Sequence, residues 1–382
     1  MFVTWPKLGK VFLVKNGVRR NVKKLKSHFA VSLFSLLHWF GFYWFWRYLS
    51  RDQIVILSAH GVMDEGESTL WTPTRSQISR EHLDESIRLI SKYYQFVSMT
   101  EAVDMLSGKQ PFRPHCIVLT FDDGYRNTLT HAWPILERHG APASVYPVTG
   151  HVESREPFWF ERLDYAVQKA ANVCDEFRMG EAVVTVRRES RDTLKATVKE
   201  AIVAAKSIPG NDIEARECID RAISFLEKKS GARLNDISEI DAWSASMTWA
   251  EVKEASEVGL EVGSHTVDHA RLGLLDEQEV WRQLNESKKT LERVLDKPVD
   301  FLCYPNGSYS DVVLKIARDA GYRAALTTKE GVNKQGDDLF QLKRFHIPQG
   351  PGRTAVESLA VASGLLFELS KLKMRLLSVF RG

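Results

Sequence analysis

Two adjacent carboxylates, Asp122 and Asp123, follow the apolar run 117–121 and precede Gly124. The run is typical of a buried strand that delivers acids to a loop. Because successive side chains of a strand point in opposite directions, the two acids suit two tasks, so that one binds a metal while the other handles protons. The structural alternative is an N-cap for a helix that begins near Tyr125, with Gly124 in the turn.

Two histidines four residues apart, His265 and His269, follow the short apolar segment 260–262. On a helical turn, imidazoles at this spacing face the same way and can share a cation. Two histidines and a carboxylate leave positions around an ion open for water and substrate, which is the layout of a catalytic site. Such a pair alone is more typical of solvated or core histidines, but together with the acidic strand end it predicts a divalent metal centre.

The segments Thr-Phe-Asp-Asp-Gly (120–124) and Ser-His-Thr-Val-Asp-His (264–269) resemble the first two motifs of the polysaccharide deacetylases, carbohydrate esterase family four. The resemblance spans about residues 53–348 and also includes segments 56–62, 304–307 and 342–344. It implies an α/β fold, a distorted (β/α) barrel with its site at the C-terminal mouth of the strands. That placement agrees with two motifs that each follow a predicted strand.

The resemblance also implies roles for the motif residues. Asp122 would be the catalytic base. Asp123, His265 and His269 would bind zinc, although another divalent metal would suit the same ligands. The resemblance implies removal of N-acetyl groups from amino sugars of a polysaccharide or lipid-linked glycan. A divalent ion suits this reaction, because it lowers the pKa of a bound water and polarises a carbonyl oxygen.

The remaining catalytic candidates come from three further segments. The family supplies an oxyanion-binding N–H from the turn after its third-motif strand, here that of Asn306. The amine that leaves needs a proton, and His346 and His60, each predicted at a strand end, are the candidates for its donor.

The third motif departs from the family pattern. Leu302 and Cys303 occupy the neighbourhood of the Arg that usually orients the base, and no Asp-Trp pair follows the strand that begins at Tyr322. We expect Arg344, on the last strand, to take the place of that Arg by pairing with Asp122.

Strands and helices alternate along most of the chain, as a parallel barrel requires. We expect a helix capped by Thr100 and a capping box at Thr248 and Glu251. The expected strands are 53–59, 96–97, 117–121, 144–148, 260–262, 301–304 and 322–327, and the expected helices include 79–93, 125–138, 276–295 and 310–320.

The alternation stops between residues 156 and 246, where amphipathic, highly charged segments predict a helical insertion at the mouth of a barrel domain that spans 53–350. Its opening, 157–162, is aromatic, and Trp159 could stack on a sugar ring or merely seat the insertion on the barrel. Tyr304 is the second candidate for contact with substrate. The charges around 195–229 lack interleaved aromatic residues, so they indicate a solvated face and no nucleic-acid partner.

Both ends of the chain are basic and apolar. Eight Lys and Arg residues lie within 7–26, before any acidic residue, and 29–46 carries no charge and is rich in aromatic residues. We expect region 1–52 to associate with a membrane as a signal anchor or an interfacial helix, on a side that the sequence leaves open; the alternative is a helix packed on the barrel. No small-residue cleavage site follows 29–46, which argues against a removed signal peptide. The tail 351–382 is predicted to form a basic amphipathic helix that either binds the membrane surface or packs on the barrel.

Composition places the chain in a broad class of proteins, and a few rival functions remain. With 44% hydrophobic and 26% charged residues and a net charge of +3, the 382-residue chain is ordinary globular protein, and its four cysteines show no paired spacing. An oligomeric state is not predicted. Rival functions are deformylation of a lipid-linked amino sugar and carbohydrate binding without catalysis. An iron oxygenase, which also uses two His and one carboxylate, has no use for the second Asp.

Overall fold

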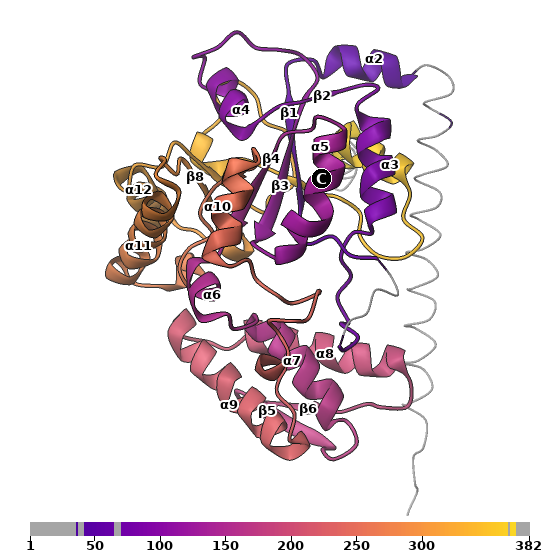
Figure 1. Cartoon of the computed structure of the whole chain (residues 1–382), viewed down its shortest axis with the longest axis vertical. Helices are drawn as coiled ribbons and strands as arrows, with labels where there is room; N and C mark the ends of the chain where they lie inside the picture. The colour runs from indigo at the N-terminus through magenta and orange to yellow at the C-terminus, as the bar shows by residue number, and fades with distance from the viewer. Residues whose placement is uncertain (1–35, 37–41, 65–69, 366, 372–382) are drawn as a thin grey trace, which may run out of the picture.

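The computed structural model describes residues 36, 42–64, 70–365 and 367–371, and parallel strands form its centre (Figure 1). The strands are β1 (Ile54–Ala59), β2 (Gln95–Phe96), β3 (Cys116–Asp123), β4 (Ala143–Pro147), β7 (Glu261–Val262), β8 (Phe301–Cys303), β9 (Ala324–Leu326) and β10 (Phe345–His346). One sheet has the order β10-β1-β3-β4-β7, β2 pairs with the start of β3, and β8 pairs with β9. Parallel bridges from Ser264 to Leu302 and from Leu326 to Leu342 join the two sheets at both edges. The strands therefore close into the distorted barrel predicted from sequence.

The central strand, β3, shows how the barrel positions its functional groups. All eight of its residues are buried. Leu119 and Phe121 face the layer between the barrel and the helices, whereas Val118 packs inside the barrel with Ile54 and Ile56 of β1. Because the side-chain period of a strand is two, Asp122 lies on the same inner face as Val118.

Helices cover the outside of the barrel (Figure 1). They are α3 (Arg80–Ile90), α4 (Met99–Leu106), α5 (Trp133–Arg138), α6 (Thr149–Ser154), α10 (Trp249–Glu257), α11 (Glu277–Leu295) and α12 (Asp311–Asp319), with the π-helical turn η1 (Thr128–Ala132) before α5. The predicted capping box of Thr248 and Glu251 is present. The cap predicted at Thr100 is wrong: Ser98 caps α4 in a capping box with Glu101, which makes Thr100 the second residue of the helix.

The insertion has a hydrophobic core of its own, formed by residues such as Leu163, Phe177, Val198 and Ile223. Its elements are α7 (Trp159–Ala170), β5 (Glu176–Met179), β6 (Ala182–Thr185), α8 (Arg191–Lys206) and α9 (Asp212–Ser230). The prediction of an entirely helical insertion is wrong, because β5 and β6 form an antiparallel hairpin whose apolar side covers the helices. Figure 1 shows the insertion at the end of the barrel toward which the strands point.

The described parts of both chain ends pack on the barrel. Helix α2 (Phe42–Leu49) lies at the end of the barrel opposite the insertion (Figure 1) and donates a hydrogen bond of 2.9 Å from Trp46 Nε1 to the carbonyl of Ser363. Helix α13 (Ala355–Ala362) packs against α3, and Leu359 and Leu365 are buried in the outer core. The barrel's core thus continues beyond the boundary predicted at residue 350.

Other parts of the predicted end regions, including 1–35 and 372–382, lie outside the described residues. Among the helices that the structure does describe, none is both long and apolar enough to cross a membrane.

Candidate metal centre and active site

Asp123, His265 and His269 meet at the mouth of the barrel, and all three are buried. Oδ1 of Asp123 lies 3.5 Å from Nε2 of His265 and 3.4 Å from Nε2 of His269. Ligand atoms at about 2.1 Å from a tetrahedral ion stand about 3.4 Å apart, so these spacings fit an ion such as Zn²⁺. Within the described part of the chain, Asp123 Oδ1 has no hydrogen-bond partner, which is costly for a buried carboxylate oxygen unless a cation binds there. The three residues therefore fit a metal.

The two histidines are brought together by a loop, so the predicted helical turn is wrong. Residues 265–269 follow β7 without helical structure, and both Thr266 (φ 69°) and His269 (φ 54°) have left-handed backbone conformations. Asp123 has a φ of 73° as well. Non-glycine residues in this region of backbone space are strained, and such strain concentrates at functional sites. The loop backbone, rather than helical periodicity, aims the imidazoles at Asp123.

Further contacts orient the imidazoles. Nδ1 of His265 lies 2.7 Å from the carbonyl oxygen of Cys303, and because a carbonyl only accepts, Nδ1 carries the proton and Nε2 is free to bind a metal. The ring of His269 packs edge-on against Phe158, with the ring centres 5.4 Å apart. Burial lowers the pKa of His269 to about 4, which keeps it in the neutral form that a metal requires.

Asp122 faces the barrel interior and is paired with Arg344, as expected from the sequence. The guanidinium donates two parallel hydrogen bonds of 2.8 Å, one to each carboxylate oxygen. Arg344 also donates to the hydroxyl of Thr120 at 3.2 Å and to the carbonyl of Thr327 at 2.9 Å. Burial alone would raise the pKa of Asp122, but the charge and hydrogen bonds of Arg344 outweigh burial and hold this pKa well below its usual value.

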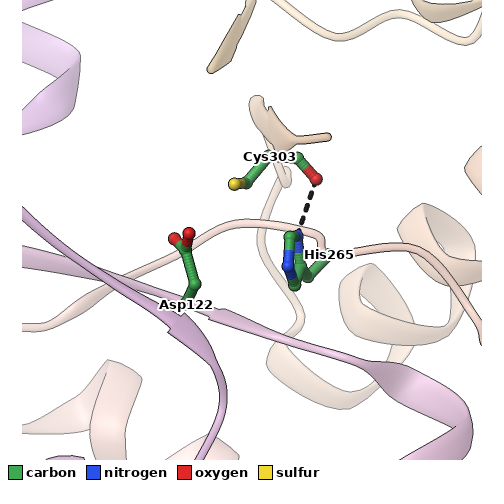
Figure 2. A group of neighbouring side chains, drawn as sticks. All are labelled: Asp122, His265 and Cys303. Atoms are coloured by element: carbon green, nitrogen blue, oxygen red, sulfur yellow. Dashed lines mark hydrogen bonds between the residues drawn. The ribbon is translucent and has the colours of Figure 1, made fainter. Parts of the chain in front are cut away.

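A second group of side chains that could bind a metal shares His265 with the first group. Figure 2 shows Asp122, His265 and Cys303 converging, with the hydrogen bond from His265 to the backbone of Cys303 drawn as a dashed line. Arg344 occupies this group, because it pairs with Asp122 and its Nη2 lies 3.1 Å from Cys303 Sγ. Burial also raises the pKa of the Cys303 thiol. A guanidinium repels a metal ion, and a protonated thiol binds one poorly, so the structure favours the set of Asp123, His265 and His269.

The two proton-donor candidates lie side by side at the ends of β1 and β10. The rings of His60 and His346 are stacked, with centroids 5.7 Å apart and planes 15° from parallel. Ser58 Oγ lies 2.9 Å from Nδ1 of His346. Burial lowers the pKa of both histidines, that of His60 to about 4, even though the nearby carboxylates oppose the shift.

The structure places the two predicted sugar-contact residues differently. Tyr304 is completely buried and stacks on Tyr309 in the outer core, with 5.1 Å between ring centroids, so its assignment to substrate binding is wrong. The reason is strand periodicity: Cys303 points inward, and the next residue must point outward. Trp159 is half-buried against the core of the insertion, and it is the neighbouring Phe158 that contacts His269. The aromatic segment therefore seats the insertion on the barrel.

Three charged or titratable residues near the site were missed from the sequence. The guanidinium of Arg75, in the loop before α3, lies 4.3 Å from the ring centre of Phe160. Nζ of Lys206, at the end of α8, donates a 2.8 Å hydrogen bond to Oδ1 of Asn306, the predicted oxyanion residue. Glu161 is buried and accepts a 2.7 Å hydrogen bond from the Tyr125 hydroxyl, and burial raises its pKa to about 8. No motif marks these positions, and Lys206 lies in the charge run that was interpreted as a solvated face.

A parallel barrel that holds an Asp-His-His set beside an arginine-bound Asp is the arrangement that the resemblance implies. The sequence matches the polysaccharide deacetylase family over residues 109–199 and 225–325, half of its 382 residues. The chain belongs to the polysaccharide deacetylase family.

Relatives with curated names agree with this family. Over 262 residues the chain is 28% identical to YxkH of Bacillus subtilis (strain 168), whose name assigns it to the polysaccharide deacetylases; the match covers 69% of this chain and 62% of YxkH. Over 104 residues it is 33% identical to the poly-β-1,6-N-acetyl-D-glucosamine N-deacetylase of Escherichia coli (strain K12), covering 27% of this chain and 15% of that enzyme. The chain thus spans less than two thirds of either relative.

Solved structures show the same fold. The deacetylase PplD of Streptococcus pyogenes, in complex with acetate, aligns with a TM-score of 0.52 at 21% identity, over 81% of this chain and 98% of PplD. IcaB from Ammonifex degensii aligns with a TM-score of 0.50 at 18% identity, over 82% of this chain and 97% of IcaB. These similarities extend the shared fold over most of the described chain.

Proposed function

We propose that this protein is a metal-dependent hydrolase that removes N-acetyl groups from amino sugars of a polysaccharide or lipid-linked glycan. The observation that carries the proposal is the position of Asp122. An ionised carboxylate, held by two hydrogen bonds from Arg344, is adjacent in the chain to Asp123, whose Oδ1 lies within 3.5 Å of two histidine nitrogens. One acid is therefore available for proton transfer while the other binds a metal.

When bound, a divalent ion such as Zn²⁺ supplies Lewis-acid polarisation of the acyl carbonyl and lowers the pKa of water. Asp122 accepts the proton of the attacking water. Each carboxylate oxygen can accept two hydrogen bonds, so the pair with Arg344 leaves acceptor capacity for that proton. The bidentate contact keeps Asp122 ionised and fixes its orientation.

The other residues act on the carbonyl oxygen and on the leaving amine of the amide. The backbone N–H of Asn306 stabilises the oxyanion, and this residue has a left-handed conformation (φ 54°) in the short 3₁₀ turn Pro305–Gly307 that follows β8. The stacked pair of His60 and His346 supplies the proton for the amine. Because burial lowers the pKa of each in the free protein, the pair must take up a proton during turnover before it can protonate the amine.

The names of the relatives support an acetylated amino sugar as the substrate. One is named a poly-β-1,6-N-acetyl-D-glucosamine N-deacetylase, and another, from Bacillus cereus and 31% identical over 75 residues, a peptidoglycan-N-acetylglucosamine deacetylase. A non-catalytic role would be favoured if His346, His60 and Arg344 all pointed away from the metal, but Arg344 points to Asp122, the neighbour of Asp123.

The test is acetate release from acetylated chitooligosaccharides by the purified full chain, before and after treatment with a chelator and after return of Zn²⁺. We expect activity to disappear with the chelator and to return with the ion. His265→Ala should lower the bound metal and abolish release. Release that survives chelation, or an unchanged metal content in His265→Ala, would contradict the proposal. A formylated substrate tested in parallel decides between deacetylation and deformylation.

We further propose that the N-terminal region attaches the protein to a membrane surface. This rests on the eight basic residues within 7–26 and on the uncharged aromatic stretch 29–46. Helix α2 supports it, because this helix lies at the end of the barrel opposite the insertion (Figure 1) and its Trp44 and Tyr48 are exposed. In that orientation the candidate active site opens away from the membrane.

A further inference from the structure

Two cations at the rim of the candidate site have no acidic partner. Within the described part of the chain, neither Arg75 nor Lys206 forms an ion pair, although ion pairs occupy many of the other arginines. Both side chains are exposed. A positive charge that lacks a carboxylate partner next to a site is available to a ligand.

Each cation is held by a contact with a residue of the site. The guanidinium of Arg75 lies over the ring of Phe160, which in turn packs edge-on against the metal ligand His269 at 6.1 Å between centroids. Lys206 is fixed twice: its Nζ bonds Asn306 Oδ1 at 2.8 Å, and its carbonyl accepts a 2.9 Å hydrogen bond from Arg271. Two elements far apart in sequence thus direct their charges to the same mouth.

The charges lie within electrostatic range of each other. Partial burial lowers the pKa of Lys206, and the positive charges of Arg75 and Arg271 lower it further. Asp123 acts on Arg75 and Lys206 in the opposite direction, which places both cations near the metal centre.

Neighbouring acids do not neutralise the two cations. Asp123 is directed at the two histidines and would be neutralised by a metal. Glu161 is buried with a pKa raised to about 8, so it is largely uncharged at neutral pH. Burial raises the pKa of Asp164, and its Oδ2 accepts hydrogen bonds of 2.8 Å from the backbone and the hydroxyl of Thr74 instead of pairing with Arg75. The rim therefore keeps an excess of positive charge.

We propose that Arg75 and Lys206 bind an anionic group, a carboxylate or a phosphate, that the glycan substrate carries next to the acetylated sugar. Arginine and lysine bind such oxyanions through charge-assisted hydrogen bonds, the arginine with two parallel donors. The inference rests on the proposed function, because it assigns a substrate class to the same site. It makes the insertion, through Lys206, part of substrate recognition.

The experiment compares three probes with the zinc-loaded full chain. They are tetra-N-acetylchitotetraose (chitotetraose below), a tetrasaccharide that alternates N-acetylglucosamine with glucuronate, and the same acetylated chitotetraose with a 1-phosphate. We expect a higher kcat/KM for one or both acidic probes, and the identity of the preferred probe separates a sugar carboxylate from a phosphate. In Arg75→Gln and in Lys206→Gln, the acidic-to-neutral ratio of kcat/KM should fall by about tenfold, the scale of one charged hydrogen bond. Lys199→Gln, which removes another exposed lysine of α8, should leave the ratio unchanged.

Binding measured by calorimetry makes the test independent of turnover. The wild-type protein should bind the preferred acidic probe more tightly than chitotetraose, and each rim variant should lose that difference, whereas Lys206→Arg should keep it. Equal binding of all probes, or a preference that survives both Gln variants, overturns the proposal. In that case, metal-dependent deacetylation of chitotetraose would still support the proposed function. Conversely, if no probe is turned over but the acidic probe still binds more tightly, the proposed activity is rejected and the anion site is retained.

Discussion

The candidate site has a floor, formed by Asp122, Arg344 and the predicted metal ligands, and a rim that carries Arg75 and Lys206, and the two parts are built differently. On the floor, Asp122 is held by Arg344, and Arg344 is in turn held by Thr120 and Thr327, all on or next to barrel strands. On the rim, Arg75 and Lys206 come from a loop and from the insertion, and the charged group of each contacts one uncharged side chain. A buried floor, in which Asp122 and Arg344 are paired, suits chemistry that every substrate needs, whereas exposed cations on separate elements suit the choice of substrate.

The insertion can change without disturbing the floor because it has its own core. Its buried residues pack mainly on each other, whereas the floor depends on the strand register of the barrel. Variation of Lys206 would alter recognition while the metal ligands stay in place. The predictions below test this division.

The largest expected effect is on stability, from loss of the buried cation of the floor. Arg344→Met leaves the buried charge of Asp122 unpaired, and we expect it to lower the free energy of unfolding by about 3–5 kcal/mol in urea denaturation. Arg75→Gln loses one exposed contact with an aromatic ring and should cost less than about 1 kcal/mol. Similar losses for the two variants would remove the distinction between floor and rim.

The second largest expected effect is a loss of turnover in a variant that still binds the metal. Asp122→Asn preserves the shape of the side chain and the three metal ligands but cannot take a proton at the required pKa. We expect unchanged zinc content by elemental analysis and a loss of kcat of about 10²-fold or more, the scale of general base catalysis. Near-normal turnover would exclude Asp122 as the base.

Glu161, a buried residue of α7, should make stability depend on pH. Its pKa is near 4.5 in the unfolded chain and is raised to about 8 in the folded protein, so between these values the folded state binds a proton that the unfolded state has lost. Stability therefore falls as pH rises from about 5 to 8. Glu161→Gln should flatten this part of the curve in thermal melts and should gain most over wild type near pH 8. Parallel curves for the two proteins would show that Glu161 ionises normally.

The smallest effect concerns the end of the barrel farthest from the site. We expect the full chain to sediment with anionic liposomes more than a chain that begins at Gln53, because each basic residue near such a surface contributes about 1 kcal/mol that salt screens. Both proteins retain the C-terminal segment, since Leu359 and Leu365 belong to the barrel core. Equal sedimentation of two folded proteins would reject membrane attachment through residues 1–52.

Local patterns in the sequence were enough to predict much of this protein. Apolar runs of strand length, followed by acids or histidines, predicted the strands and the residues now found around Asp123, whereas the distorted barrel was predicted from the family resemblance. Caps such as Thr248 with Glu251 were also predictable, because a capping box involves side chains only three residues apart.

Tertiary structure decided what depends on register and on distant contacts. His265 and His269 converge through a strained loop, whereas Tyr304 turns outward because Cys303 points inward. The hydrogen bond from Lys206 to Asn306 joins residues 100 positions apart. Periodicity predicts which residues of a segment share a face. Which of these faces meets the metal centre depends on how the barrel closes and on how the insertion packs on its own core, and periodicity does not contain that information.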